Sequence, residues 1–330
     1  MLFLHHDRLA RYLPAVCVLI IIFSQFPGIC KTPPVLHSGS VSCIPSSAVL
    51  AVCGDNRIYI VNASKAAESG YETAIMRSWN AAEEAGILGL ESTVCDHIDE
   101  CKPVNGGKDL MVTSSYGWCV LLDICTKKIL FHTSLCTGAH SAELLPSGRI
   151  AIACSDKGNA LQIYDISGPD KIIYSTNFVS AHGLFWNEDT KRLYVAGGQL
   201  LNIYELAGWN TSSPSLKLVK SIKTPEGAIH DLTFAGRNKL CISGRCSYLY
   251  DMAAEDFEEL PLFESSGALK SVNYDMSTGQ FWYTDATIPE GNESWSSHTI
   301  RYALRMQGGE VYSEFKIPDM DVYKVRVLKW

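Results

Sequence analysis

The sequence lacks clustered positive charge. Its 330 residues contain 28 Lys and Arg against 35 Asp and Glu, a net charge of −7, and no run of basic residues stands out. Binding to a phosphate backbone depends on a basic patch or stripe. We therefore expect no nucleic-acid partner.

The local motifs of several common enzyme classes are also missing. The sequence has no paired Cys-x-x-Cys motifs for structural zinc and no Ser, His and Asp in a triad order. It also has no glycine-rich loop of the phosphate-binding or dinucleotide-binding kind, and the pair Gly197–Gly198 is interpreted as a hairpin turn. A reaction must therefore be sought in residues that the fold brings together.

Long apolar runs are absent beyond the N-terminal region, which has the pattern of a targeting sequence. Arg8 and Arg11 precede an apolar stretch from Leu13 to Phe23. This order is typical of a cleaved signal peptide, and the stretch is short for a bilayer span. We expect residues 1–30 to be a signal peptide, with an uncleaved anchor as the alternative, and no membrane contact after cleavage.

Two further features favour a secretory route. Sequons for N-glycosylation occur at Asn62, Asn210 and Asn292. Ten of the twelve cysteines lie beyond Cys30, a high number for a reducing compartment. The protein is therefore expected to be secreted or to reside in the lumen of the secretory pathway.

The cysteines allow two interpretations. Cys241 and Cys246 flank an expected hairpin turn, and Cys95 lies close to Cys101, so both pairs are candidate disulfides. Alternatively, several cysteines, such as Cys53, are small buried apolar residues on strands. Spacing alone does not decide between these interpretations.

A short pattern with one basic side chain recurs six times. Its members are Cys101-Lys102, Ala139-His140, Ala181-His182, Ile229-His230, Leu269-Lys270 and Tyr323-Lys324. They follow one another at intervals of 38, 42, 48, 40 and 54 residues, and such a period is typical of propeller blades. If each stretch begins the innermost strand of a blade, the six basic groups meet around one axis.

Further strand patterns follow the basic residues. In one repeat they are Arg149–Ala153, Gln162–Asp165 and Lys171–Tyr174. Four short antiparallel strands repeated six times predict an all-β fold, a six-bladed β-propeller. We assign residues 31–47 to a linker and residues 48–330 to a single propeller domain.

The first repeat lacks its innermost strand, and the sequence ends on a strand with no blade after it. Val322–Leu328 is therefore expected to complete the first blade and leave no open sheet edge. A competing candidate for this position is Leu36–Ser38. Two insertions interrupt the repeat, a short helix or loop at Trp79–Glu100 and a segment at Thr287–His298.

Strand alternation predicts the layer below the basic ring. Residues two positions beyond each basic residue point to the same side of the strand. They are Val104, Ala142, Leu184, Leu232, Val272 and Arg326. The expected site is a shallow pocket whose apolar floor is broken only by Arg326.

The predicted ring divides into a histidine half and a lysine half. His140, His182 and His230 can relay protons near neutral pH, so with Lys270 they are the candidate catalytic residues. Clustered ammonium groups favour a lowered lysine pKa or a bound anion. The candidate substrate-binding residues are Lys102, Tyr323, Lys324 and Arg326. The alternative is that the ring residues only bond to neighbouring blades.

Three histidines on adjacent strands are also a candidate open site for a divalent metal. Its ligands would be His140, His182 and His230, which lack any local ligand spacing. We expect no cofactor, and a divalent metal is the alternative.

The run from Ala139 to Ala153 contains His-Ser-Ala-Glu-Leu-Leu-Pro-Ser-Gly and is the most specific segment of the chain. With Ala181–Trp186, Ile229–Asp231 and Tyr323–Arg326, it resembles an uncharacterised family of secreted bacterial and fungal six-bladed propellers. The resemblance covers residues 48–330 and implies the fold and the ring, but no activity. More remotely, the architecture is similar to secreted propeller lyases that use histidines and a divalent metal, and to fungal hetero-Diels–Alderases that need no cofactor.

These observations together predict an enzyme. We expect a monomeric, cofactor-independent lyase or cyclase, of the hetero-Diels–Alderase type in secondary-metabolite biosynthesis, that binds an anionic or enolic small molecule in its axial pocket. The alternatives are a non-catalytic module for a glycan or acidic ligand, a metal-dependent lyase, and a scaffold that works through its rim.

Overall fold

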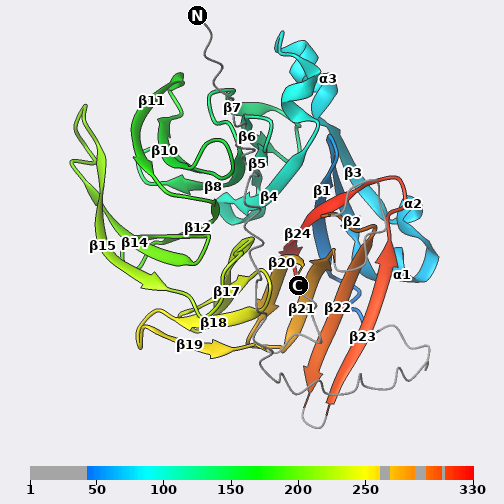
Figure 1. The fold of residues 1–330 in the computed structure, drawn as a ribbon. Helices are drawn as coiled ribbons and strands as arrows, with labels where there is room; N and C mark the ends of the chain where they lie inside the picture. The colour runs from blue at the N-terminus through cyan, green and yellow to red at the C-terminus, as the bar shows by residue number, and fades with distance from the viewer. Residues whose placement is uncertain (1–42, 261–267, 287–294, 307–308) are drawn as a thin grey trace, which may run out of the picture. The chain divides into compact units, whose positions relative to one another are not determined.

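The computed structural model describes residues 43–260, 268–286, 295–306 and 309–330. These residues form six four-stranded antiparallel sheets arranged in a ring (Figure 1). The prediction of an all-β, six-bladed propeller is confirmed. The expected signal peptide at 1–30, most of the expected linker at 31–47, and Leu36–Ser38 lie outside the described residues.

The sheets are numbered here as blades in chain order, with the strand nearest the axis given first. Blade 1 contains β24 (Val322–Lys329), β1 (Val49–Gly54), β2 (Arg57–Asn62) and β3 (Ile75–Asn80). Blade 2 contains β4 (Ile98–Val104), β5 (Asp109–Ser114), β6 (Trp118–Asp123) and β7 (Ile129–Thr133). Blade 3 contains β8 (Ala139–Leu145), β9 (Arg149–Cys154), β10 (Ala160–Asp165) and β11 (Gly168–Asn177).

The second half of the chain repeats this arrangement. Blade 4 contains β12 (Ala181–Asn187), β13 (Arg192–Gly197), β14 (Leu200–Ala207) and β15 (Ser215–Lys223). Blade 5 contains β16 (Asp231–Gly236), β17 (Lys239–Ser243), β18 (Ser247–Asp251) and β19 (Asp256–Glu259). Blade 6 contains β20 (Leu269–Asp275), β21 (Gln280–Asp285), β22 (Thr299–Met306) and β23 (Gly309–Lys316). Each innermost strand contacts those of both neighbouring blades.

The C-terminal strand closes the ring. β24 pairs with β1 in antiparallel register, with Lys324 opposite Cys53 and Arg326 opposite Ala51 (Figure 1). The inner edge of blade 1 is thereby paired, as the sequence predicted. This closure also places Lys324 and Arg326 of β24 on the axis.

In the part of the chain that the structure describes, helices occur only in and between the first two blades. In the insertion before blade 2, α3 (Ala81–Ile87) begins at Asn80, whose Oδ1 accepts hydrogen bonds from the backbone N–H groups of Ala82 and Glu83. The short helix predicted there is confirmed. The other helical segments are α1 (Ala63–Ser69), α2 (Tyr71–Ala74) and the 3₁₀ turns η1 (Ser92–Cys95) and η2 (Asn105–Gly107). Within the described ranges, no helix is both long and apolar enough to span a membrane.

The core is divided into six apolar clusters, one between each pair of neighbouring blades. Between blades 1 and 2, for example, Trp79 stacks on Trp118 with ring centroids 5.9 Å apart. Both faces of a blade are therefore covered. This explains why strands such as β5, β6 and β9 are buried along their whole length.

The two disulfides considered from the sequence are absent, because every cysteine in the described part of the chain is a free thiol. Cys241 is buried in the core between blades 5 and 6, whereas Cys246 donates its Sγ–H to Glu226. Cys95 turns its Sγ–H toward the carbonyl oxygen of Ser92, 2.9 Å away, and not toward Cys101. Most of these cysteines instead fit the alternative of small buried apolar residues.

Candidate functional site

A β-bulge at the start of the innermost strands determines which side chains reach the axis. The shift in register leaves one residue of the strand without a partner on the second strand of its blade. These residues are Asp99, His140, His182, Lys270 and Tyr323. His230 holds the same place directly before β16. We call these six residues the upper ring, and the face of the propeller on which they lie the upper face.

The upper ring corrects the predicted ring of six basic groups at two positions. Lys324 lies one residue beyond the bulge at Tyr323, and Lys102 lies three residues beyond the bulge at Asp99. An acid and a phenol therefore occupy places that the sequence pattern assigned to lysines. The prediction holds for His140, His182, His230 and Lys270.

The predicted apolar floor is wrong, because a bulge interrupts strand alternation. The bulged residue and its successor both face the axis, so the next residue turns outward. Ala142, Leu184, Leu232 and Val272 accordingly lie in the cores between blades. The layer directly below the upper ring consists of Glu100, Ser141, Gly183, Asp231, Ser271 and Lys324.

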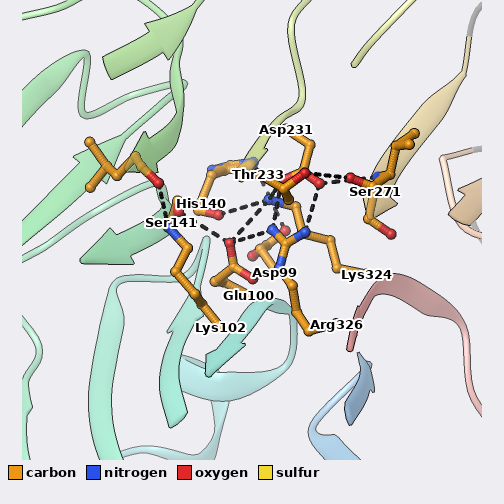
Figure 2. Close-up of polar contacts among 12 residues, drawn as sticks. Asp99, Glu100, Lys102, His140, Ser141, Asp231, Thr233, Ser271, Lys324 and Arg326 are labelled. Carbon is orange, nitrogen blue, oxygen red and sulfur yellow. Dashed lines mark hydrogen bonds and ion pairs between the residues drawn. The ribbon is translucent and has the colours of Figure 1, made fainter. Parts of the chain in front are cut away.

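This lower layer is built around a buried ion cluster (Figure 2). Arg326 donates to both oxygens of Glu100, each at 2.7 Å, and to both oxygens of Asp231, at 2.6 and 2.7 Å. Lys324 Nζ lies 3.5 Å from each of the same two carboxylates. Arg326 is 2% exposed and Lys324 is fully buried. Two cations thus neutralise two carboxylates out of reach of solvent.

The cluster keeps its carboxylates ionised. Burial acts to raise the pKa of Glu100, but Arg326 and Lys324 outweigh it and hold that pKa below its usual range. The same balance, led by burial and reversed by Arg326, lowers the pKa of Asp231. Because Glu100 comes from blade 2, Asp231 from blade 5 and both cations from blade 1, the cluster links three blades.

Neighbouring side chains of this layer bond to adjacent blades. Ser141 donates to Glu100 at 3.1 Å, and Ser271 accepts a hydrogen bond from the backbone N–H of Val325 at 3.0 Å. Asp231 also accepts from the backbone N–H of Val272 at 3.2 Å. The sequence analysis considered that the ring residues only bond to neighbouring blades. The structure shows this role for the lower layer.

The predicted substrate-binding cations are already engaged in the structure. Lys102 Nζ donates to the carbonyl oxygen of Leu184 at 2.6 Å and lies 3.3 Å from Glu143. Lys324 and Arg326 belong to the ion cluster. Their role in binding a substrate stays a prediction, as does that of Tyr323, which lies in the upper ring and is 4% exposed.

The upper-ring histidines lie against one another. The ring centroids of His140 and His182 are 4.5 Å apart, and those of His182 and His230 are 5.1 Å apart. Nδ1 of His140 bonds to the Gly138 carbonyl at 2.8 Å, and Nδ1 of His182 to the Ser180 carbonyl at 2.9 Å. Since a carbonyl only accepts, these contacts place the proton on Nδ1 and leave Nε2 as the basic nitrogen in the neutral ring.

Two of these histidines are held neutral at physiological pH. Burial, followed by repulsion from His140, lowers the pKa of His182 well below its usual range. Burial, followed by repulsion from Lys270, lowers the pKa of His230 to about 3. The side chain of His140 is 12% exposed, and its Nε2 lies 3.9 Å from Asp99. His140 is therefore the imidazole of the upper ring that is placed next to a carboxylate.

Lys270 is a buried cation whose nearest acidic influence, Asp99 of the upper ring, is not within ion-pair distance. Its Nζ donates to Nε2 of His230 at 3.1 Å and lies 5.8 Å from the ring centroid of Tyr323. Among the described residues, no carboxylate comes within ion-pair distance of Nζ, although the residue is only 8% exposed. Burial, followed by repulsion from Lys324, lowers the pKa of Lys270 to about 8. In its protonated form such a lysine binds an anion, and in its neutral form it can attack an electrophile.

A row of aromatic rings leads from the surface to Lys270, and the sequence pattern did not predict it. His97 stacks on Tyr116 with centroids 5.9 Å apart, and its ring lies 4.0 Å from that of Trp295. Trp295 lies 5.8 Å from Tyr323, which contacts Lys270. Tyr116 is 59% exposed, so the row begins at solvent. His97, Tyr116 and Trp295 lie outside the repeated pattern, in the turns and insertions between strands, where a periodic motif gives no information.

A hollow of about 350 Å³ is lined in part by the segment that directly precedes His230. It is lined by Gln199, Pro225, Glu226, Gly227, Ala228 and Arg245. Ala228 has a left-handed backbone, with φ of 58°, two residues before His230. The volume of the hollow falls in the range of small-molecule sites, and the lining of the hollow is largely polar.

The metal alternative finds no matching geometry in the part of the chain that the structure covers. There, no three His, Cys, Asp or Glu side chains are arranged to hold a metal ion. In His140 and His182 one ring nitrogen is taken up by a backbone carbonyl, and His230 Nε2 accepts from Lys270.

The fold defines the protein as a six-bladed propeller, and comparison with known proteins adds a family match over part of it. The model of the "Family of unknown function (DUF6528)" matches residues 78–227, which span blades 2 to 4. No curated protein matches the sequence. The family match carries no activity that could be assigned to the upper ring.

Solved structures support the same fold. One similar structure is a chain of the "Crystal Structure of Mitotic Checkpoint Complex", with 13% sequence identity, 83% of this chain and 78% of that chain covered, and a TM-score of 0.50. In all, 1301 chains of solved structures match. At this identity the likeness concerns the fold alone.

Proposed function

We propose that the upper ring binds a small molecule with an anionic or enolic oxygen and transfers a proton on it, as a cofactor-independent lyase or cyclase. Lys270 holds the oxygen, and His140 moves the proton through Nε2. The observation that carries the proposal is the unpaired ammonium of Lys270 beside neutral His230. A bound anion would supply the charge partner that the described residues do not provide.

The aromatic row supports a ligand with a planar ring. A ring stacked against Trp295 or Tyr323 would lie next to Lys270, and aromatic stacking adds to the binding free energy. Elimination and cyclisation on enolic precursors need an acid or base and a charge clamp, but no cofactor. A pericyclase of the hetero-Diels–Alderase type is one such cyclase.

Binding can be tested with 4-hydroxycoumarin, a planar compound whose enol is ionised at neutral pH. We expect the protein to bind it in calorimetry, and Lys270→Met to weaken binding by about tenfold or more, since a charge-assisted contact is lost. Lys157→Met is the matched control, because Lys157 is an exposed lysine on the turn between β9 and β10. Equal binding by both variants would place the ligand elsewhere and contradict the proposal.

Exchange of the vinylic proton of the same probe in heavy water separates catalysis from binding. We expect the wild-type protein to accelerate this exchange and His140→Gln to remove the acceleration while binding persists. Binding without accelerated exchange would favour the alternative, a non-catalytic module for acidic ligands. The polar hollow lined in part by the segment before His230 is the observation that favours this second function.

We also propose that the protein follows a secretory route, and the sequons provide a test. Asn210 is exposed between β14 and β15, whereas Asn62 uses its side chain to cap α1 and to donate to the Ser46 carbonyl. A glycan on Asn210 would lie in solvent, whereas a glycan on Asn62 would remove its side chain from the helix cap and oppose folding. After expression through a eukaryotic secretory pathway, peptide mapping should find glycan at Asn210 and none at Asn62. Glycan at Asn62, or an unmodified Asn210, would contradict this prediction. Asn292 lies outside the described residues.

A further inference from the structure

The arrangement around Lys270 is that of a nucleophilic amine. Nζ is buried, has a second cation, Lys324, in the layer below, and makes its one described hydrogen bond to an imidazole. An amine is a nucleophile only when it has lost its proton, and burial next to another cation favours that loss. Glu100 and Asp231 are bound by Arg326 in the ion cluster, so among nearby carboxylates it is Asp99 of the upper ring, outside ion-pair distance of Nζ, that favours the protonated form of Lys270.

We propose that Lys270 forms a Schiff base with an aldehyde or ketone that enters from the upper face. The proposal rests on the proposed function, because it names the substrate class of the same site as a carbonyl compound with a planar ring. Three features carry it, the missing acidic partner of Nζ, the contact with His230, and the row of rings that ends at Tyr323.

The step balances without a cofactor. The lone pair of neutral Nζ forms a bond to the carbonyl carbon, and the electron pair of the C=O bond moves to oxygen. A proton passes from nitrogen to that oxygen through water and gives a carbinolamine. Its hydroxyl group takes a proton from solvent and leaves as water, so that a protonated C=N bond remains, which hydrolysis reverses. The protonated imine withdraws electrons from the neighbouring carbon and would ease the elimination or cyclisation proposed above.

His230 would act as a positioning residue in this step. Its neutral Nε2 accepts a hydrogen bond from Nζ, which fixes one N–H direction and restricts rotation of the amine. Its Nδ1 has no hydrogen-bond partner among the described residues. His230 itself is a poor proton acceptor here, since its pKa lies at about 3.

Reductive trapping tests the proposal on the full-length protein. The protein is incubated at neutral pH with benzaldehyde and sodium cyanoborohydride, and every lysine is followed by peptide mapping. We expect N-benzylation of Lys270 at least about tenfold faster than that of Lys157, because each unit of lowered pKa raises the neutral fraction about tenfold. Addition of 4-hydroxycoumarin should slow modification of Lys270 and leave Lys157 unaffected.

Formaldehyde with the same reductant is a second probe, since it reaches amines that a ring cannot. If neither aldehyde modifies Lys270 ahead of Lys157, the Schiff-base proposal is overturned. Failure of trapping together with Lys270-dependent binding of 4-hydroxycoumarin would overturn this inference alone. Failure of both would overturn the proposed function as well.

Discussion

Arg326→Met is expected to destabilise the propeller by about 3–5 kcal/mol, because it leaves two buried carboxylates with only one cation. Arg326 makes the four shortest contacts of the ion cluster, and these join blades 1, 2 and 5. The total free energy of unfolding of a domain is about 5–15 kcal/mol, so the loss is a large part of it. Urea denaturation followed by tryptophan fluorescence would measure it, since Trp118 and Trp282 are buried.

Arg57→Met is the matched control. Arg57 pairs with Asp319 at 3.3 Å, but both side chains are more than a third exposed. An exposed pair contributes about 1 kcal/mol or less, so this variant should unfold close to the wild type. Equal losses in the two variants would show that the axial cluster does not hold the blades together.

In contrast to Arg326→Met, Lys270→Met is expected to raise the free energy of unfolding and so to stabilise the fold. A lysine pKa lowered from 10.5 to about 8 corresponds to a cost on the order of 3 kcal/mol for keeping the buried group charged at neutral pH. Methionine has a similar length and no charge, so this cost is removed. The substitution also removes the hydrogen bond to His230, and this loss offsets about 1 kcal/mol of the gain. The expected net gain is about 1–2 kcal/mol.

The pH dependence of this gain follows from the direction of the shift. The unfolded chain binds the proton more tightly, so the folded wild type gains stability as pH rises from about 8 toward 10.5. The advantage of Lys270→Met is therefore complete below pH 8 and vanishes near 10.5. Lys157→Met serves as the control, with no change at either pH. A destabilised Lys270→Met would assign Lys270 a structural role and contradict this account.

The fold was readable from the sequence because it repeats. Strand patterns recur at blade spacing, the last strand lacks a blade of its own, and Lys324 and Arg326 lie on it. Because both faces of each sheet are buried, these strands are apolar along their whole length. Their positions can therefore be recognised in the sequence even where apolar and polar residues do not alternate. The helices α1 and α2 were missed because they occupy a connection within blade 1 that the other blades lack.

The site was readable only in part, because one bulge changes its geometry. A bulge adds a residue to one strand and leaves no composition signal, so the ring positions of Tyr323 and Asp99 were assigned to Lys324 and Lys102, although Tyr323 was named as a substrate-binding candidate. The acidic partners Glu100 and Asp231 were not assigned to the axis for the same reason. They lie next to ring positions, and only a bulge turns two successive side chains inward. The three histidines and Lys270 were found because their bulges coincide with the basic residue.

The pKa of Lys270 tests the central claim most directly. Selective ¹³C labelling of lysine Cε, with assignment by Lys270→Met, would give its titration by NMR in the native protein. The structure predicts a midpoint at about pH 8 for Lys270. A midpoint for Lys270 at 10.5 or above would mean that a carboxylate or solvent stabilises its charged form, and would contradict both the binding site and the Schiff base proposed for it.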